Sequence, residues 1–360
     1  MDHAQGDVPA AQDPSAARRS AYATVGTALG LLSDRRLADI VAATPVLGAG
    51  IGGRAAELDV DGVRVFVKRV PLTDLELRPE HERSTANLFE LPLFYQYGVG
   101  SAGFGAWREL AAHLMTTGWV LRGGHPGFPL LYHWRILPDQ PPTGFADAFG
   151  GIEGAVAHWE GSAAVRRRLQ AVGRSSASLV LFLEHVPHTL AAWLADHEDP
   201  GTALPWMEDA LTRGTAFMSD RGLVHFDAHF HNLLTDGRQV YFADFGLALS
   251  SRFELSAKEA EFLSDHLLYD RCYVPTHLLR HHLLDRVRGD VSRETYVREW
   301  GTGHRRDGVP PRTAAFLDRH ARTATVLDDF HHRLLTRSKR TPFPAEDLRA
   351  ALNASPAARS

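Results

Sequence analysis

Aspartate, histidine and asparagine side chains gather in two short segments in the second half of the chain. Residues 225–232 read His-Phe-Asp-Ala-His-Phe-His-Asn, and residues 244–246 read Asp-Phe-Gly. Asn232 follows Asp227 by five residues, and Asp244 lies twelve residues further on. A carboxylate can orient an acceptor hydroxyl and take its proton, while an amide oxygen and a second carboxylate hold Mg²⁺ on phosphates. The spacing therefore predicts ATP-dependent phosphoryl transfer, with Asp227 as catalytic base and Asn232 and Asp244 as Mg²⁺ ligands.

Lysine is so rare in this chain that its positions are informative. Only three of the 39 Lys and Arg residues are lysine, and Lys68 lies in an alternating apolar run over residues 63–70 that predicts a strand. A compact ammonium on a flexible stem reaches phosphate oxygens as a point charge, where a planar guanidinium would not fit. An exposed strand residue is the ordinary alternative. The rarity and the strand position favour a phosphate contact for Lys68.

A glycine cluster precedes this strand, with Gly48, Gly50 and Gly53 as the candidate phosphate-binding positions. Glycines let backbone amides approach phosphates without obstruction by side chains. The same letters are compatible with a dinucleotide-binding fingerprint, but that motif should open a helix. Here a strand and an Asp61-Gly62 hairpin follow, and they lead into the lysine strand. A plain surface loop is the remaining alternative.

Taken in order, the glycine loop, the strand lysine, residues 225–232 and Asp244-Phe-Gly resemble the protein-kinase-like superfamily over about residues 45–270. The resemblance implies ATP and Mg²⁺ as cofactors and a glutamate that pairs with Lys68. Glu109, in a predicted helix over residues 106–115, is the candidate, and Glu82 and Glu90 are alternatives. The apolar run at residues 179–186 predicts a strand that enters a hinge. The backbone around the last three residues of that run would meet the adenine edge: Glu184, His185 and Val186.

Several positions depart from a regulated protein kinase. Phe226 stands where many such kinases carry an arginine, and no Ala-Pro-Glu follows Asp244-Phe-Gly. His229, a third catalytic candidate, stands where protein kinases usually carry lysine and looks more like the aminoglycoside-phosphotransferase branch. The spelling Asp-Phe-Gly-Leu-Ala is that of protein kinases. The acceptor hydroxyl therefore stays open between a small molecule, a peptide and a protein Ser/Thr.

Two other functions are compatible with parts of the sequence. His225, Asp227, His229 and His231 alternate, so an extended segment would turn all four to one side, as in a zinc-dependent hydrolase. That alternative leaves Asn232, Lys68 and the second segment unexplained. A pseudokinase scaffold that binds partners through its aromatic insertions is the other alternative. It has no chemical need for all of the catalytic positions.

The order of predicted elements, with strands in the first half and helices in the second, indicates an α+β two-lobed protein. The resemblance implies that this is a protein-kinase-like fold with a β-rich N-lobe and a helical C-lobe. We predict a disordered tail over residues 1–18 and a β-rich N-lobe over 19–186, interrupted by insertions at about 71–104 and 138–176. A helical C-lobe then covers 187–352 and a flexible tail covers 353–360.

Composition limits the remaining function classes. A net charge of −4 over 360 residues argues against a nucleic-acid-binding surface. Cys272 is the only cysteine, which excludes an internal disulfide and favours a reducing compartment. The sequence has no apolar run of membrane-spanning length and no secretory signal pattern. We expect a cytoplasmic protein without a membrane span, and the sequence leaves its oligomeric state open.

Overall fold

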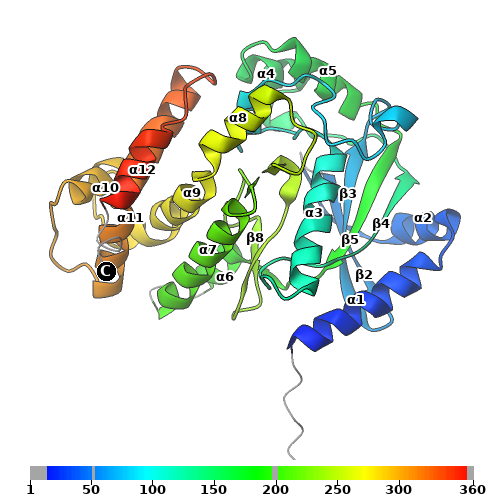
Figure 1. Cartoon of the computed structure of the whole chain (residues 1–360), viewed down its shortest axis with the longest axis horizontal. Coiled ribbons are helices and arrows are strands. Elements are labelled where there is room, and N and C mark those ends of the chain that lie inside the picture. The colour runs from blue at the N-terminus through cyan, green and yellow to red at the C-terminus, as the bar shows by residue number, and fades with distance from the viewer. Residues whose placement is uncertain (1–13, 51–52, 197–201, 355–360) are drawn as a thin grey trace, which may run out of the picture.

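The computed structural model describes residues 14–50, 53–196 and 202–354 and has an α+β fold (Figure 1). In chain order the helices and strands are α1 (Pro14–Gly30), α2 (Asp34–Ala43), β1 (Val46–Gly50), β2 (Gly53–Val60), β3 (Val63–Leu72), α3 (Ala106–Leu121), β4 (Leu131–Pro138), α4 (Ile152–His158), α5 (Ala163–Val172), β5 (Ala177–Glu184), β6 (His188–Thr189), α6 (Leu190–Ala195), α7 (Leu204–Ser219), β7 (Leu223–Val224), β8 (Leu233–Thr235), β9 (Val240–Phe242), β10 (Leu249–Ser250), α8 (Ala257–His266), α9 (Tyr269–Leu278), α10 (Arg293–Gly301), α11 (Pro311–Thr336) and α12 (Ala345–Asn353). Short 3₁₀ turns and a π-helical turn at Leu279–Leu283 lie between them.

The main sheet is antiparallel, and its order within the described residues is β1-β2-β3-β5-β4. Asp61 and Gly62 connect β2 to β3 with positive φ angles of 51° and 80°, the backbone that a tight hairpin turn requires. The predicted hairpin is therefore confirmed. β3 lies in the interior of the sheet, paired with β2 and β5 along its length, so the position of Lys68 is fixed by neighbours on both sides.

Side-chain alternation gives the sheet two differently covered faces. Val65 and Val67 of β3 point to the face that α1 and α2 cover. Val70 and Leu72 point to the opposite face, where they pack with Trp107 of α3. Lys68 lies two residues before Val70 in β3, so its side chain is on the same face of the sheet. It therefore projects toward α3, into the interior of the protein.

Helices α6 to α12 build the rest of the molecule, on the left of Figure 1, around a large core to which Phe226, Phe230 and Phe245 contribute. The prediction that strands are confined to the first half is wrong in detail. β7 pairs with β10, and β8 pairs with β6 and β9, in the second half of the chain. These strands are two or three residues long, too short for a recognisable alternation in the sequence.

The two predicted insertions, at about residues 71–104 and 138–176, are folded and contribute to the main core. All the aromatic side chains of the first insertion are buried: Phe89, Phe94, Tyr95, Tyr97 and Phe104. The second segment forms α4 and α5, and the ring of Trp159, which follows α4, packs edge-on against that of Tyr95 at 4.7 Å. The two segments therefore pack on each other, although β4 and the helix before it separate them in the chain.

The predicted boundary of the N-terminal tail at residue 18 is too late. α1 begins at Pro14, and Arg18 in its second turn donates hydrogen bonds to both carboxylate oxygens of Glu184, at 2.8 and 2.7 Å. The same guanidinium reaches the carbonyl oxygens of Pro126 and Phe128. These contacts hold the helix on the sheet where composition alone suggests disorder. The predicted C-terminal tail of residues 353–360 also begins too early, since α12 includes Asn353. Residues 1–13 and 355–360 lie outside the described residues.

Among the described residues, no helix combines the length and the apolar character that crossing a membrane requires.

Candidate active site

Three charged residues from distant parts of the chain meet at one point. The Nζ atom of Lys68 lies 2.6 Å from Oε1 of Glu109 and 2.8 Å from Oδ1 of Asp244. Lys68 comes from β3, Glu109 from the first turn of α3, and Asp244 follows β9. The ion pair expected between Lys68 and Glu109 is present. The alternatives Glu82 and Glu90 are both exposed, away from this buried ammonium.

The protonation of this group follows from its charges. Burial works to lower the pKa of Lys68, but the carboxylates of Asp244 and Glu109 outweigh it and raise that pKa above its usual value. Burial alone would raise the pKa of Asp244, whereas the Lys68 ammonium lowers it to about 2. Both residues are therefore charged at neutral pH. The side chain of Asp244 is 41% exposed, so a carboxylate held ionised by Lys68 remains accessible to a ligand.

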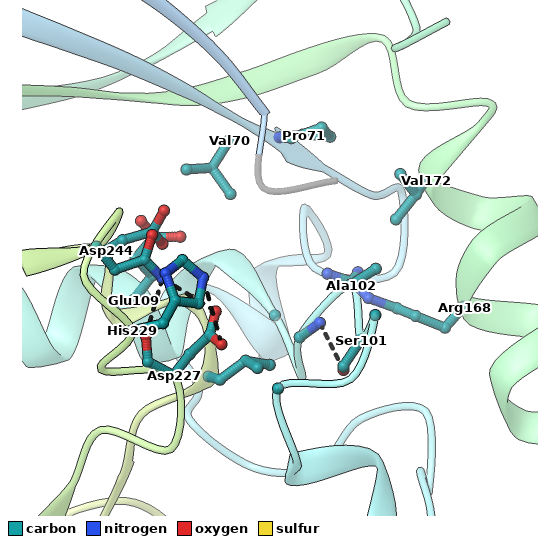
Figure 2. Close-up of a pocket in the computed structure, with 17 residues that line it drawn as sticks. Val70, Pro71, Ser101, Ala102, Glu109, Arg168, Val172, Asp227, His229 and Asp244 are labelled. Atoms are coloured by element: carbon teal, nitrogen blue, oxygen red, sulfur yellow. Dashed lines mark hydrogen bonds and ion pairs between the residues drawn. The ribbon is translucent and has the colours of Figure 1, made fainter. Parts of the chain in front are cut away.

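Asp227 and Asn232 are joined by a short loop. The Nδ2 atom of Asn232 donates hydrogen bonds to the main-chain carbonyl oxygen and to Oδ2 of Asp227, each at 3.0 Å. The amide oxygen of Asn232 is thereby left to bind a cation. Burial raises the pKa of Asp227, and the adjacent His229 works in the opposite direction. His229 Nε2 lies 3.7 Å from Oδ1 of Asp227 (Figure 2).

This loop is held by an aspartate that sequence patterns did not reveal. The carboxylate of Asp270 in α9 accepts hydrogen bonds from the backbone N–H groups of His225, at 2.6 Å, and Phe226, at 3.1 Å. Phe226 has a φ of 63°, which is unfavourable for a residue with a side chain, so these two bonds stabilise a strained turn. Asp270 stands in an ordinary helical segment, and nothing in its spacing signals this contact.

Phe245 connects the second segment to both neighbouring elements. Its buried ring lies 5.1 Å from the ring of His113 in α3 and 5.0 Å from the ring of His225. His225 in turn contacts the carbonyl oxygen of Ala243 through Nε2, at 2.8 Å. His225 therefore fixes the loop against the Asp-Phe-Gly segment. His113 was not predicted, since a lone histidine on a helix gives no signal.

A first cavity, of about 430 Å³, lies beneath the glycine loop. Its walls bring together predicted residues from both halves of the chain: Gly48, Gly53, Lys68, Glu184, His185, Val186, Asn232 and Asp244. Gly53 has a φ of 122°, and a Cβ there would lie 2.2 Å from the carbonyl oxygen of Arg69, so only glycine fits. Gly50 ends β1 and pairs with Gly53, whereas residues 51–52 lie outside the described residues.

The predicted hinge residues differ in what their side chains can do. The carboxylate of Glu184 is occupied by Arg18 and by the backbone N–H of Leu130, at 3.0 Å. His185 Nε2 lies 3.2 Å from Oε1 of Glu57. A ligand in this cavity would therefore meet the backbone of the segment, since the Glu184 side chain already has its partners.

A second cavity, of about 260 Å³, lies on the other side of Asp244 (Figure 2). Asn232 and Asp244 line both cavities, whereas Asp227 and His229 line only the second. The site thus has two compartments that meet at the candidate metal ligands. No sequence pattern indicated the far wall of the second compartment, which comes from the two inserted segments.

Helix α3, which carries Glu109, is held at two points, by a buried ion pair and by a backbone hydrogen bond to a buried glutamate. Arg108 Nη2 donates to Oε1 of Glu259 in α8 at 2.6 Å, and the side chains of both residues are almost fully buried. Glu76 accepts hydrogen bonds from the first backbone N–H of α3, at Ala106, and from Arg168 Nη1 in α5, both at 2.8 Å. The inserted segments therefore help to position Glu109.

The local backbone does not match the zinc-hydrolase alternative. Residues 225–231 are not extended, because Phe226 adopts a positive φ and the N–H of His229 turns back to the carbonyl of Asp227. In the described part of the chain, no three or more His, Cys, Asp or Glu side chains form a metal-binding group. Oxygens of Asn232 and Asp244 suit Mg²⁺, which retains several waters and needs only one or two protein carboxylates.

Comparison with known proteins does not assign the chain to a family. Neither a scan of protein-family models nor a search of curated proteins found a match to the chain.

Proposed function

We propose that the protein is an ATP- and Mg²⁺-dependent phosphotransferase with a two-lobed, protein-kinase-like fold, which transfers the γ-phosphate of ATP to a hydroxyl group. The observation that carries the proposal is the contact between Lys68 and Asp244. It joins a strand lysine to the Asp-Phe-Gly aspartate at the boundary of two cavities. A lysine that contacts phosphates and a carboxylate that binds their metal have to lie this close.

Each compartment has a distinct task in this proposal. ATP lies under the glycine loop, with its adenine edge against the backbone of residues 184–186 and its phosphates directed to Lys68. Asn232 and Asp244 hold Mg²⁺, which supplies neutralisation of the charge on the β- and γ-phosphate oxygens. The acceptor lies in the second cavity, where Asp227 orients its hydroxyl.

Proton transfer follows from the state of Asp227. Its carboxylate accepts the proton of the acceptor hydroxyl as the new oxygen–phosphorus bond forms and the bond to ADP breaks. Burial raises the pKa of Asp227, which makes the carboxylate a better base than an exposed aspartate. The Asn232 side chain donates to Oδ2, so Oδ1 is the oxygen turned toward the acceptor.

The proposal is tested by combining ligand-induced thermal shift with transfer of labelled γ-phosphate. We expect ATP to raise the unfolding temperature only when Mg²⁺ is present, and label to reach an acceptor or, slowly, water. Stabilisation without any turnover would instead identify a pseudokinase scaffold. Stoichiometric bound zinc without ATP stabilisation would identify a metallohydrolase. Absence of any Mg-ATP stabilisation rejects both ATP-binding hypotheses.

A further inference from the structure

The first inserted segment reaches the proposed catalytic base directly. A Cβ at Gly98 would lie 2.2 Å from Oδ1 of Asp227, and one at Gly103 would lie 2.5 Å from the carbonyl oxygen of Gly246. The backbone of residues 98–103, the roof loop, therefore passes over both catalytic segments without room for a side chain at either contact. Gly103 also has a φ of 72°, which favours glycine independently.

The second inserted segment supports the roof loop from behind. The ring of Phe149 lies against Gly100, where a Cβ would come within 2.2 Å of it. Arg168 and Val172 of α5 complete the wall of the second cavity. In Figure 2, Ser101 and Ala102 of the roof loop lie on the same side of the cavity as Arg168, with Asp227 and His229 on the opposite side. The cavity is thus bounded by catalytic residues at one end and by inserted segments at the other.

The far end of this cavity includes one buried, positively charged side chain. Arg168 is 2% exposed, and its Nη1 atom is held by Glu76. Its Nε atom has no hydrogen-bond partner among the described residues. A buried N–H group without a hydrogen-bond partner is unfavourable, because the loss of its hydration is not compensated. A polar group that reaches Arg168 after a small side-chain shift would recover part of that loss.

We propose that the acceptor is a low-molecular-weight polar alcohol that fits between Asp227 and Arg168, and not a residue of a protein or an extended peptide. This inference rests on the proposed phosphotransferase function. Ligand pockets for drug-sized molecules have volumes of roughly 300–1,000 Å³, and this cavity, at about 260 Å³, is slightly smaller, which suits a small metabolite-sized molecule. An extended chain needs a groove that continues past the reacting hydroxyl, whereas the roof loop and α5 stand in that path.

The size of what can enter is measurable without knowing the acceptor, because the chain offers a clean cysteine background. Cys272, its only cysteine, is 1% exposed, and burial raises the pKa of its thiol to about 12, so it is a poor nucleophile. Ser101→Cys is nearly isosteric and places one thiol in the cavity. Lys258→Cys, on the exposed face of α8, is the matched control.

The experiment compares the rates at which methyl methanethiosulfonate and a polyethylene-glycol maleimide modify each variant, with N-ethylmaleimide as the small reagent of the same chemistry. We expect methyl methanethiosulfonate and N-ethylmaleimide both to modify Ser101→Cys. For each variant, the rate with the polymer is divided by the rate with N-ethylmaleimide. We expect this ratio to be at least an order of magnitude lower for Ser101→Cys than for Lys258→Cys. Equal relative rates at both positions would overturn the proposal, because a peptide could then enter as well. No reaction of Ser101→Cys with either small reagent would overturn it too, since no acceptor could reach Asp227.

A second variant separates this inference from the proposed function. Gly98→Ala adds a methyl group against Asp227 and, when combined with Ser101→Cys, should slow the reaction of the introduced thiol with N-ethylmaleimide. Gly30→Ala, which meets no atom within 4 Å, should leave that rate unchanged in the same combination. Unchanged labelling in the Gly98→Ala background would contradict the assigned position of the roof loop. These rates need no turnover, so a protein that fails to bind Mg-ATP still gives a decisive answer about the cavity.

Discussion

Lys68 and Asp244 are 176 residues apart in the chain, yet their side chains form a 2.8 Å ion pair across the boundary between the main sheet and the helical part. Asp244 has a φ of 59°, so the backbone adopts an unfavourable conformation to present this carboxylate. Both features indicate a site that the fold holds ready for a charged ligand.

Replacing Lys68 tests the charge at the centre of this site. We expect Lys68→Met to lower the rate of phosphoryl transfer by about a hundredfold or more, the scale of losing a preorganised charge contact. Lys258→Met removes an exposed lysine and should leave the rate unchanged. Steady-state turnover of labelled ATP checks both. Activity of Lys68→Met within a few-fold of the unmodified protein would show that another cation contacts the phosphates.

Replacing Asp227 separates catalysis from nucleotide binding. Asp227→Asn should abolish transfer, because the amide cannot take the acceptor's proton, while the Mg-ATP thermal shift persists, since Asp227 lines only the second cavity. Asp227→Ala should give the same loss of transfer. Asp39→Asn, at an exposed position of α2, is the control. Turnover by Asp227→Asn equal to that of the control would remove this residue from the mechanism.

The Arg108–Glu259 pair tests how α3 is positioned. Breaking a buried ion pair from one side costs about 3–5 kcal/mol, so Arg108→Met should lower the free energy of unfolding by that order. Adding Glu259→Gln removes the uncompensated charge, and the double variant should lose less than the two single variants combined. Urea denaturation measures these values. Arg64→Met, which breaks the exposed pair with Glu57, should cost at most about 1 kcal/mol.

The same variants report on the active site. Glu109 occupies the position next to Arg108, so loosening α3 should reduce turnover at temperatures where the Arg108→Met variant is still folded. Full activity in a folded Arg108→Met variant would indicate that the second contact of α3, from the Ala106 N–H to Glu76, is sufficient to keep Glu109 against Lys68.

Stability should fall as the pH drops from about 6.5 toward 4. Burial lowers the pKa of six histidines from 6.5 to values between about 2 and about 4: His113, His225, His266, His277, His282 and His331. In this window the unfolded chain binds protons that the folded protein cannot, so acid favours unfolding. Asp270 and Asp328 act oppositely, because burial raises their pKa values to about 7 and about 6. Burial also raises the pKa values of Glu109 and Asp227, so four carboxyl groups oppose the six histidines, and a net loss of stability remains.

Unfolding temperatures measured across this range check the prediction. His282→Gln should make the curve less steep, whereas replacing the exposed His304 should not. A midpoint that stays constant or rises on acidification would contradict the direction that burial of the histidines implies.

Local patterns in the sequence were sufficient for the parts of the site that local chemistry defines. Alternation located β3, and spacing located Asp227, Asn232 and Asp244, because each pattern lies within a few residues. The partners that hold these elements were not predictable in the same way. Arg108 meets Glu259 across 151 residues and Arg168 meets Glu76 across 92, and such contacts depend on the packing of whole elements.

The roof loop illustrates the same limit. Its glycines were visible in the sequence, and a cluster of glycines indicates a close backbone approach somewhere. What they approach, the carboxylate of Asp227, follows only from the position of the first inserted segment on the second. The α+β class of the fold was predictable from the sequence, whereas the second compartment of the candidate site was not.

The ion pair between Arg18 and Glu184 has a practical consequence for the design of truncated variants. A chain begun at residue 19, where composition suggests that order starts, would retain every candidate catalytic side chain. It would nevertheless lose the guanidinium that neutralises a largely enclosed carboxylate at the end of β5. Truncation for crystallography or for a fusion tag should therefore leave α1 whole, because Glu184, which lines the first cavity, would otherwise lose its arginine partner.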